Sequence, residues 1–103
     1  MKDSEKSLQE LNFLEQNMQN LLLQKQAFQM ELSETTASLF EIKKSSEDVF
    51  KIVGQLMIKF DKNKIVQELE EKEKLIKLKL NSLDKQENVL NDKILYLREK
   101  VLN

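Results

Sequence analysis

Gly54 is the only glycine in a chain of 103 residues that contains no proline. Both residue types destabilise the interior of a helix, so their exclusion is typical of long, uninterrupted helices. Charged residues make up 34% of the chain and aromatic residues 6%, which indicates solvated helices rather than a large globular core. The chain is therefore expected to be mainly α-helical, to break near Gly54, and to form a single domain over residues 1–103.

The stretch from about residue 5 to residue 44 follows a seven-residue repeat of apolar side chains, which is typical of a coiled coil. Eight of its ten seam positions are apolar, and the exceptions are Lys25 and Thr35. Ser7 and Glu10 are spaced as a capping box, which predicts that the helix begins there. The ten seam positions are Leu11, Leu14, Met18, Leu21, Lys25, Phe28, Leu32, Thr35, Leu39 and Ile42.

A second repeat runs from about residue 62 to residue 102, and Asp61 is placed to cap the start of that helix. Nine of its eleven seam positions are apolar, and the exceptions are Glu73 and Glu87. The seam positions are Val66, Leu69, Glu73, Ile76, Leu80, Leu83, Glu87, Leu90, Ile94, Leu97 and Val101.

The polar seam residues can fix the register of a coiled coil at some cost in stability. Counting along two antiparallel helices places Lys25 opposite residues 80–84, which is too far from Glu73 to predict an ion pair. Glu87 lies nearer to Lys25, but the count does not predict a pair with it either. The other lysines and glutamates are interpreted as a solvated surface.

Residues 49–60 read Val-Phe-Lys-Ile-Val-Gly-Gln-Leu-Met-Ile-Lys-Phe, a composition that favours β-strands. Gly54 lies at the centre, where a tight turn needs a residue that tolerates positive φ. The segment is predicted to form one β-hairpin, which would hold the two helices antiparallel.

Such a hairpin is marginally stable alone, and it has two open edges and more apolar side chains than one face can hide. It is therefore expected to assemble with hairpins of other subunits into a larger sheet or barrel, which makes the protein an obligate oligomer. The predicted assembly residues are Val49, Phe50, Ile52, Val53, Gly54, Leu56, Met57, Ile58 and Phe60.

Composition argues against several other classes of function. The net charge of −1, with interspersed lysine and glutamate, does not fit a nucleic-acid-binding protein or a membrane-surface helix. No apolar run is long enough to span a membrane. Histidine and cysteine are absent and Arg98 is the only arginine, so neither a catalytic site, a metal site nor a cofactor is expected. The lack of cysteine fits an intracellular, cytoplasmic setting.

The run from Asp48 to Lys59 resembles the hairpin of prefoldin β-type subunits, and Leu80–Glu87 resembles the second helix of archaeal members. Phe50 and Met57 stand where tyrosine and leucine or valine are commoner, and both replacements keep the apolar character. The α-type subunits carry two hairpins between their helices, and this sequence has room for one.

The resemblance implies a hexamer of two α-type and four β-type subunits whose hairpins form paired β-barrels. It further implies an ATP-independent chaperone that holds non-native polypeptides at the tips of its coiled coils and passes them to a group II chaperonin. The alternative from the residues alone is a structural coiled-coil scaffold that oligomerises through the same hairpin without binding clients.

The tips are expected where the two helix termini meet, and apolar residues outside the seam are candidates for client contact there. Phe13 and Tyr96 lie farthest from the seam, whereas Leu8, Leu95 and Leu102 could instead widen the core. Leu22, Leu23 and Met30 are interpreted as isolated surface residues rather than as a cavity wall. The predicted client-binding residues are Leu8, Leu11, Phe13, Leu95, Tyr96 and Leu102.

Overall fold

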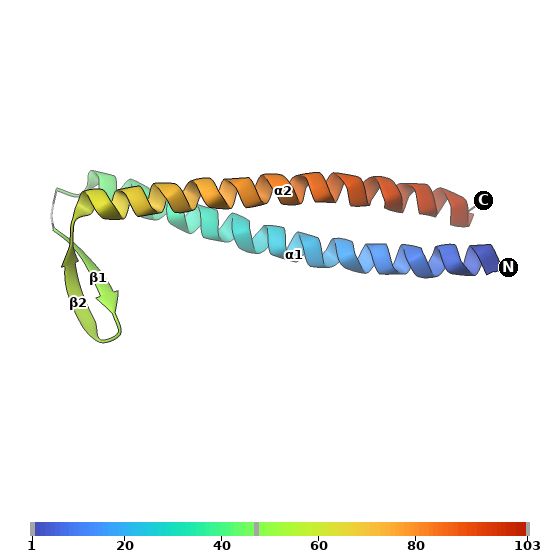
Figure 1. Ribbon diagram of the computed structural model, residues 1–103, viewed down its shortest axis with the longest axis horizontal. Helices are drawn as coiled ribbons and strands as arrows, with labels where there is room; N and C mark the ends of the chain where they lie inside the picture. Colours follow the sequence, from blue (N-terminus) through green and yellow to red (C-terminus); the bar gives the residue numbers. More distant parts are fainter. Residues whose placement is uncertain (1, 47, 103) are drawn as a thin grey trace. The chain divides into compact units, whose positions relative to one another are not determined.

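The computed structural model describes residues 2–46 and 48–102, in the order helix, strand, strand, helix (Figure 1). The elements are α1 (Lys2–Lys44), β1 (Val49–Val53), β2 (Leu56–Phe60) and α2 (Lys62–Leu102). The expected fold class, two long helices joined by one antiparallel hairpin, is confirmed.

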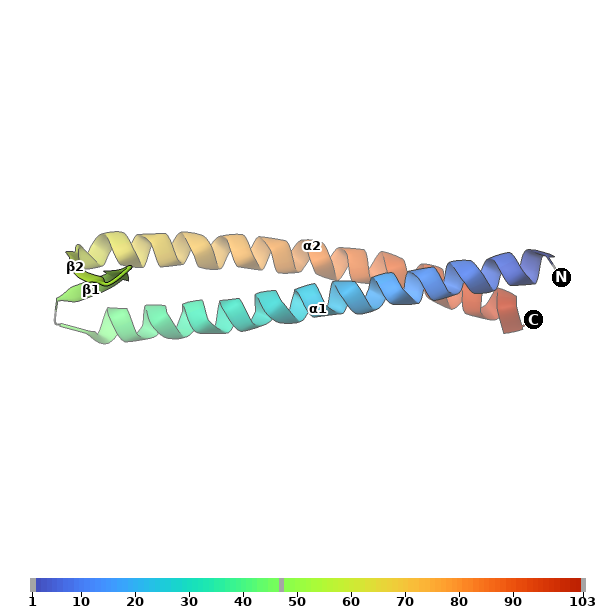
Figure 2. The same cartoon turned by 90° about the horizontal axis from the view of Figure 1, so that it is seen from below.

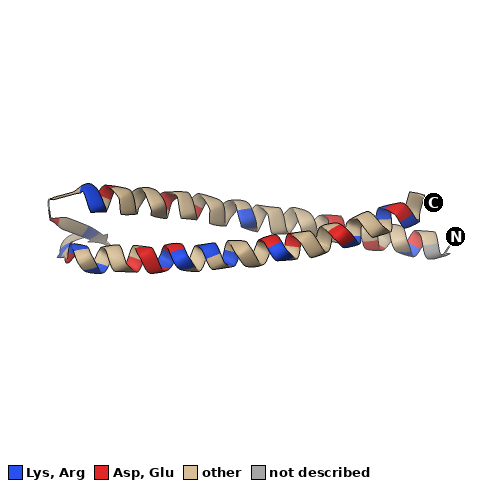
Figure 3. Ribbon diagram, turned by 90° about the horizontal axis from the view of Figure 1, so that it is seen from above, with Lys and Arg blue, Asp and Glu red and all other residues tan. Residues whose placement is uncertain are grey.

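The chain divides into two compact units. We call the first, Met1–Phe28 with Lys79–Asn103, the terminal unit, and the second, Gln29–Leu78, the hairpin unit. In the terminal unit the segments of α1 and α2 lie side by side and run in opposite directions, as Figure 1 and Figure 2 show. Acidic and basic residues are interspersed along α2, whereas α1 has longer uncharged stretches (Figure 3).

The core of the terminal unit is a cluster of buried seam residues from both helices. Leu11 of α1 is buried together with Ile94 and Leu97 of α2, and further seam residues pack around this centre. Burying these side chains removes apolar surface from water, which is the main stabilising contribution to such a pair of helices. The surrounding residues are Leu14, Met18, Leu90 and Val101.

The hairpin unit has a smaller core that includes a polar residue. Leu39 and Ile76 are buried, and so is Thr35. The Thr35 hydroxyl donates a hydrogen bond to the carbonyl oxygen of Glu31, at 2.8 Å, one turn earlier in α1. Because the hydroxyl is satisfied within its own helix, threonine occupies a seam position without an unpaired polar group.

The sequence predicted a capping residue at the start of each helix, and the structure has the predicted cap at the start of α2 but not of α1. Asp61 is the N-cap of α2, since its Oδ1 accepts a hydrogen bond from the backbone N–H of Asn63 at 3.0 Å. The capping box predicted at Ser7 and Glu10 is wrong. α1 is already helical from Lys2, and Ser7 is buried within it. No glycine or proline interrupts the residues before Ser7, so the helix extends past the pair that resembles a cap.

The hairpin register pairs Val49 with Phe60 and Val53 with Leu56, leaving Gly54 and Gln55 as a two-residue turn. Gly54 has φ +62°, and no other residue in the described ranges has positive φ. Positive φ at the first turn residue alone is the pattern of a type II′ turn, which matches the twist of the strands it joins. The single glycine therefore stands where the backbone requires it.

Candidate interaction surfaces

The hairpin presents an apolar surface on both of its faces, because side chains alternate across a strand and paired residues share a face. Each face carries one lysine among otherwise apolar strand residues. The first face consists of Phe50, Ile52, Met57 and Lys59, and the second of Val49, Lys51, Val53, Leu56, Ile58 and Phe60.

Both faces are exposed to solvent in the single chain. On the first face Ile52 and Met57 are 72% and 69% exposed, and on the second Leu56 is 67% exposed. Only Val49 and Phe60, at the ends of the strands next to the helices, are partly buried. A soluble protein rarely leaves contiguous apolar surface open in this way unless another molecule covers it.

The charged groups of the hairpin are held within it. Lys59 Nζ lies 3.3 Å from Asp48 Oδ2, and Lys51 Nζ lies 5.5 Å from the centre of the Phe60 ring. Within the described residues, β1 pairs with β2 and with no further strand, so each strand has one open edge. Two open edges and two apolar faces are what strand pairing with other chains would cover.

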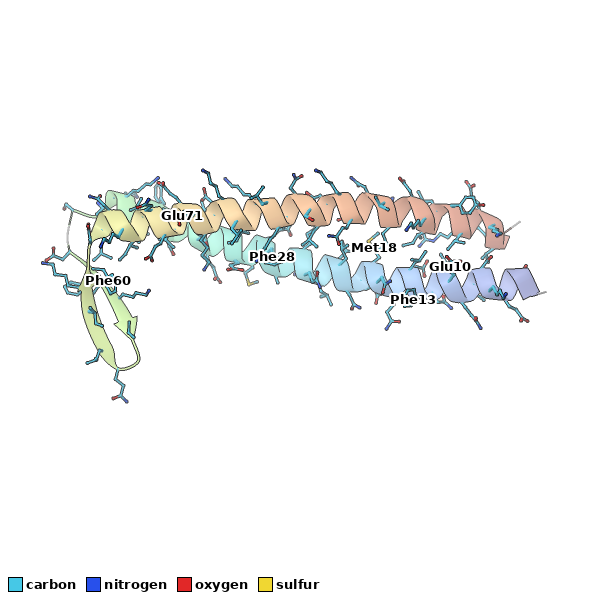
Figure 4. All side chains as sticks on the ribbon, viewed as in Figure 1. Glu10, Phe13, Met18, Phe28, Phe60 and Glu71 are labelled. Carbon is cyan, nitrogen blue, oxygen red and sulfur yellow. The ribbon has the colours of Figure 1, made fainter. Side chains whose placement is uncertain are left out.

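The terminal unit also carries exposed apolar side chains, and we call this set of residues the tip surface. Phe13 is 62% and Tyr96 is 66% exposed, and Figure 4 labels Phe13 on the terminal part of α1. The tip surface consists of Leu8, Phe13, Leu95, Tyr96 and Leu102, all of which are exposed.

Leu11, which the sequence also suggested as a client contact, lies elsewhere. It is 7% exposed and packs against Ile94 and Leu97 in the core of the terminal unit. Its heptad position turns it toward α2, so its side chain is not on the surface of this chain. We therefore assign it to the core and not to the tip surface.

A groove of about 500 Å³ separates α1 from α2 beside the tip surface. Leucines form its apolar lining, and charged side chains of both signs surround them. The groove depends on how the two helices are paired, which explains why its charged residues were not identified from the sequence. It is lined by Glu10, Leu14, Asp92, Lys93, Tyr96, Leu97 and Lys100.

Among the described residues of the terminal unit, two ionic contacts, which comprise three ion pairs, join α1 to α2. Lys25 Nζ lies 2.7 Å from Asp84 Oδ1 and 2.8 Å from Glu87 Oε1. Hydrogen bonds to Asp84 and then to Glu87 raise the pKa of Lys25 above its ordinary value. At the exposed surface, Arg98 Nη2 lies 2.9 Å from Glu15 Oε1. The sequence had not predicted either contact.

The described part of the chain has neither a candidate metal site nor a candidate membrane-spanning helix. Residues 2–46 and 48–102 contain no group of three or more acidic, histidine or cysteine side chains that could hold a metal ion. No helix in these ranges combines the length and the apolar character that crossing a membrane requires.

Comparison with known proteins shows close relatives along nearly the whole chain. A family described as prefoldin subunit matches residues 5–102. The prefoldin subunit beta of Thermococcus onnurineus is 40% identical over 96 residues, which cover 91% of this chain and 83% of the relative. The prefoldin subunit beta of Pyrococcus furiosus is 38% identical over 96 residues, which cover 91% and 82%.

A solved structure is similar as well. The crystal structure of the prefoldin beta subunit from Thermococcus strain KS-1 superposes with a TM-score of 0.91 at 35% sequence identity. The match covers 98% of this chain and 90% of that one. Fold and sequence therefore indicate the same relatives.

Proposed function

This chain belongs to the prefoldin subunit family, and from that premise we propose that it captures non-native polypeptides without ATP and passes them to a group II chaperonin. The chain is a β-type prefoldin subunit, and such subunits are chaperones. The proposed site of action is the cytoplasm. In this proposal the hairpin surface serves assembly and the tip surface serves capture.

The observation that carries the assembly part of the proposal is the exposure of both hairpin faces. A two-stranded sheet cannot cover itself, so the hairpin needs neighbouring strands. We propose that residues 1–103 act as one prefoldin-like domain whose hairpin joins those of an α-type subunit and of further copies in an α2β4 hexamer. Val49, Phe50, Ile52, Val53, Leu56, Met57, Ile58 and Phe60 would supply the apolar contacts, and Gly54 the turn.

The tip surface is the proposed site of client capture. Phe13 and Tyr96 are large, exposed and outside the core of their own unit. Apolar contact is non-directional, so it suits a receptor for unfolded chains whose exposed segments differ in sequence. The neighbouring groove, which Tyr96 also lines, combines leucines with charged side chains of both signs.

The experiment measures two properties of the chain mixed with an α-type subunit. Native mass spectrometry gives the mass of the complex, and light scattering follows aggregation of a denatured model protein without nucleotide. We expect a hexamer that delays aggregation, and the Phe13→Ser/Tyr96→Ser variant should form the same hexamer with weaker suppression. Leu23→Ser is the matched control, since Leu23 is equally exposed on α1 but lies outside the tip surface.

The second candidate is a structural scaffold that oligomerises through the hairpin and binds no client. It is favoured by the same hairpin surface but gives no role to Phe13 and Tyr96. A hexamer that leaves the aggregation rate unchanged would support the scaffold and contradict client capture.

A further inference from the structure

Lys25 is the only cation among the described seam residues of the terminal unit, and it is held by two carboxylates of the facing helix. Asp84 and Glu87 are three residues apart, so they follow each other by about one turn on the same side of α2. The Lys25 side chain is 23% exposed and that of Glu87 30%, so both charges are partly withdrawn from water. Partly desolvated charges stabilise a structure only where their partners are in place.

Apolar seam residues alone leave the alignment of two helices poorly defined, because a leucine packs well against several other leucines. A shift of one turn, four residues, in one direction would put Leu80 and Leu83 in the places of Asp84 and Glu87. Lys25 would then face two apolar side chains. The same shift in the other direction would put Asn88 and Asn91 in the places of Asp84 and Glu87, and asparagine side chains carry no charge.

We infer that Lys25, Asp84 and Glu87 fix the axial alignment of α1 on α2 in the terminal unit. Each one-turn shift moves both carboxylates away from Lys25, so among these three alignments the observed one pairs Lys25 with Asp84 and Glu87. A partly buried charge that loses its partners is destabilising, whereas the leucines on either side gain little from one alignment over another. Lys25 is thus a positioning residue, which acts through the arrangement of other side chains.

The alignment decides which residues of the two helices share the groove beside the tip surface. In the observed alignment Glu10 and Leu14 of α1 face Tyr96 and Leu97 of α2. A one-turn shift would bring a different set of α2 residues opposite Glu10 and Leu14. An effect of the alignment on client binding rests on the function proposed above. The inference that the three charges fix the alignment does not depend on that function.

The alignment can be measured with two spin labels, because the chain has no cysteine of its own. Gln26→Cys and Glu99→Cys place labels at exposed positions far apart along the terminal unit. A four-residue shift toward Leu80 and Leu83 lengthens their separation by about 6 Å at 1.5 Å per residue. The labelled chain is diluted with unlabelled chain in the α-type mixture, so that each assembly carries one label pair.

Double electron–electron resonance should give a single distance for the chain with Lys25 intact. In Lys25→Leu we expect a second distance, longer by about 6 Å, because the introduced leucine side chain packs well between Leu80 and Leu83. Lys25→Arg should restore the single distance. Lys85→Leu removes the same charge from an exposed position and should also keep the single distance.

Asp84→Asn/Glu87→Gln tests the same inference with side chains of unchanged size, so folding is preserved, which circular dichroism verifies. A broadened or lengthened distance distribution supports the inference. An unchanged single distance in both Lys25→Leu and Asp84→Asn/Glu87→Gln overturns it. The spin-label distance is measured independently of aggregation suppression. Failure of the proposed chaperone function would therefore appear in the aggregation assay and not in the distance.

Discussion

Ile52 and Met57 face each other across β1 and β2, and their side chains are 72% and 69% exposed. Cross-strand pairs normally stabilise a sheet when a second layer or another chain covers them. Here the covering surface is absent from the described part of the chain. Substitutions of this pair should therefore affect assembly of the subunits without preventing the single chain from folding.

Replacing Ile52 by aspartate and Met57 by lysine should abolish the hexamer while leaving the chain folded, because the two opposite charges face each other across the strands. Exposed substitutions typically change stability by about 0.5 kcal/mol or less, so the chain itself should still fold. Analytical ultracentrifugation of the mixture with an α-type subunit measures the loss. Leu75→Asp, at an exposed position of α2 in the hairpin unit, should keep the hexamer. An intact hexamer in Ile52→Asp/Met57→Lys would refute assembly through this face.

Gly54→Ala should destabilise the hairpin by about 1–2 kcal/mol, because an L-residue is strained at φ +62°. A Cβ at this position meets no atom within 4 Å, so strain and not crowding causes the loss. The thermal midpoint of the hexamer measures the effect, and Gln55→Ala, at the other turn position, serves as control. Equal midpoints for the two variants would contradict the assignment of a type II′ turn.

The stabilising effect of Lys25 should disappear at high pH. Its pKa in the folded chain is raised above the ordinary value of 10.5 by Asp84 and Glu87. A raised pKa stabilises the fold fully below the unfolded value, and this contribution is lost as pH rises through the folded value. The difference in melting temperature between the native chain and Lys25→Met should therefore be constant from pH 7 to about 10 and shrink above 10.5.

Lys85→Met provides the comparison for this pH dependence, since it removes an exposed lysine one residue from Asp84. Its melting temperature should follow that of the native chain across the whole range. A Lys25→Met difference that stays unchanged above about pH 11 would show that Lys25 stabilises the unit by packing and not by charge.

Ile94 and Leu95 are neighbours in α2 with opposite environments, 3% and 49% exposed. Ile94→Ala should cost about 2–5 kcal/mol, because it leaves a cavity beside Leu11 and Leu97. Leu95→Ala should change stability by about 0.5 kcal/mol or less. Urea unfolding followed by circular dichroism distinguishes the two, and similar losses would mean that Leu95 belongs to the core after all.

The helices and the hairpin could be predicted because their signals are local. Heptad spacing identifies Ile94 and Leu97 as seam residues, and positive φ in a tight turn requires a residue such as Gly54. Asp61 could be identified as a cap because its side chain bonds to backbone only two residues later.

The contacts between helices were harder to predict. Counting residues placed Lys25 opposite residues 80–84, close to the observed partner Asp84, but a pair with Glu87 depends on how far a flexible lysine extends. Ser7 was misassigned because a capping box is a short pattern that also occurs inside helices. Leu11 was assigned to both the seam and the tip, and only the paired helices show that it is buried.

The two hairpin lysines have a consequence for the chain before it meets its partners. Lys51 and Lys59 lie on opposite faces of the hairpin, one on each. If identical hairpins paired edge to edge, each copy would add two strands, so each lysine would lie two strand spacings, roughly 10 Å, from the same lysine of the next copy. Lysine on an exposed edge strand is one of the devices that disfavour pairing with further strands. A lysine on each face therefore disfavours open-ended strand pairing while leaving a closed assembly possible.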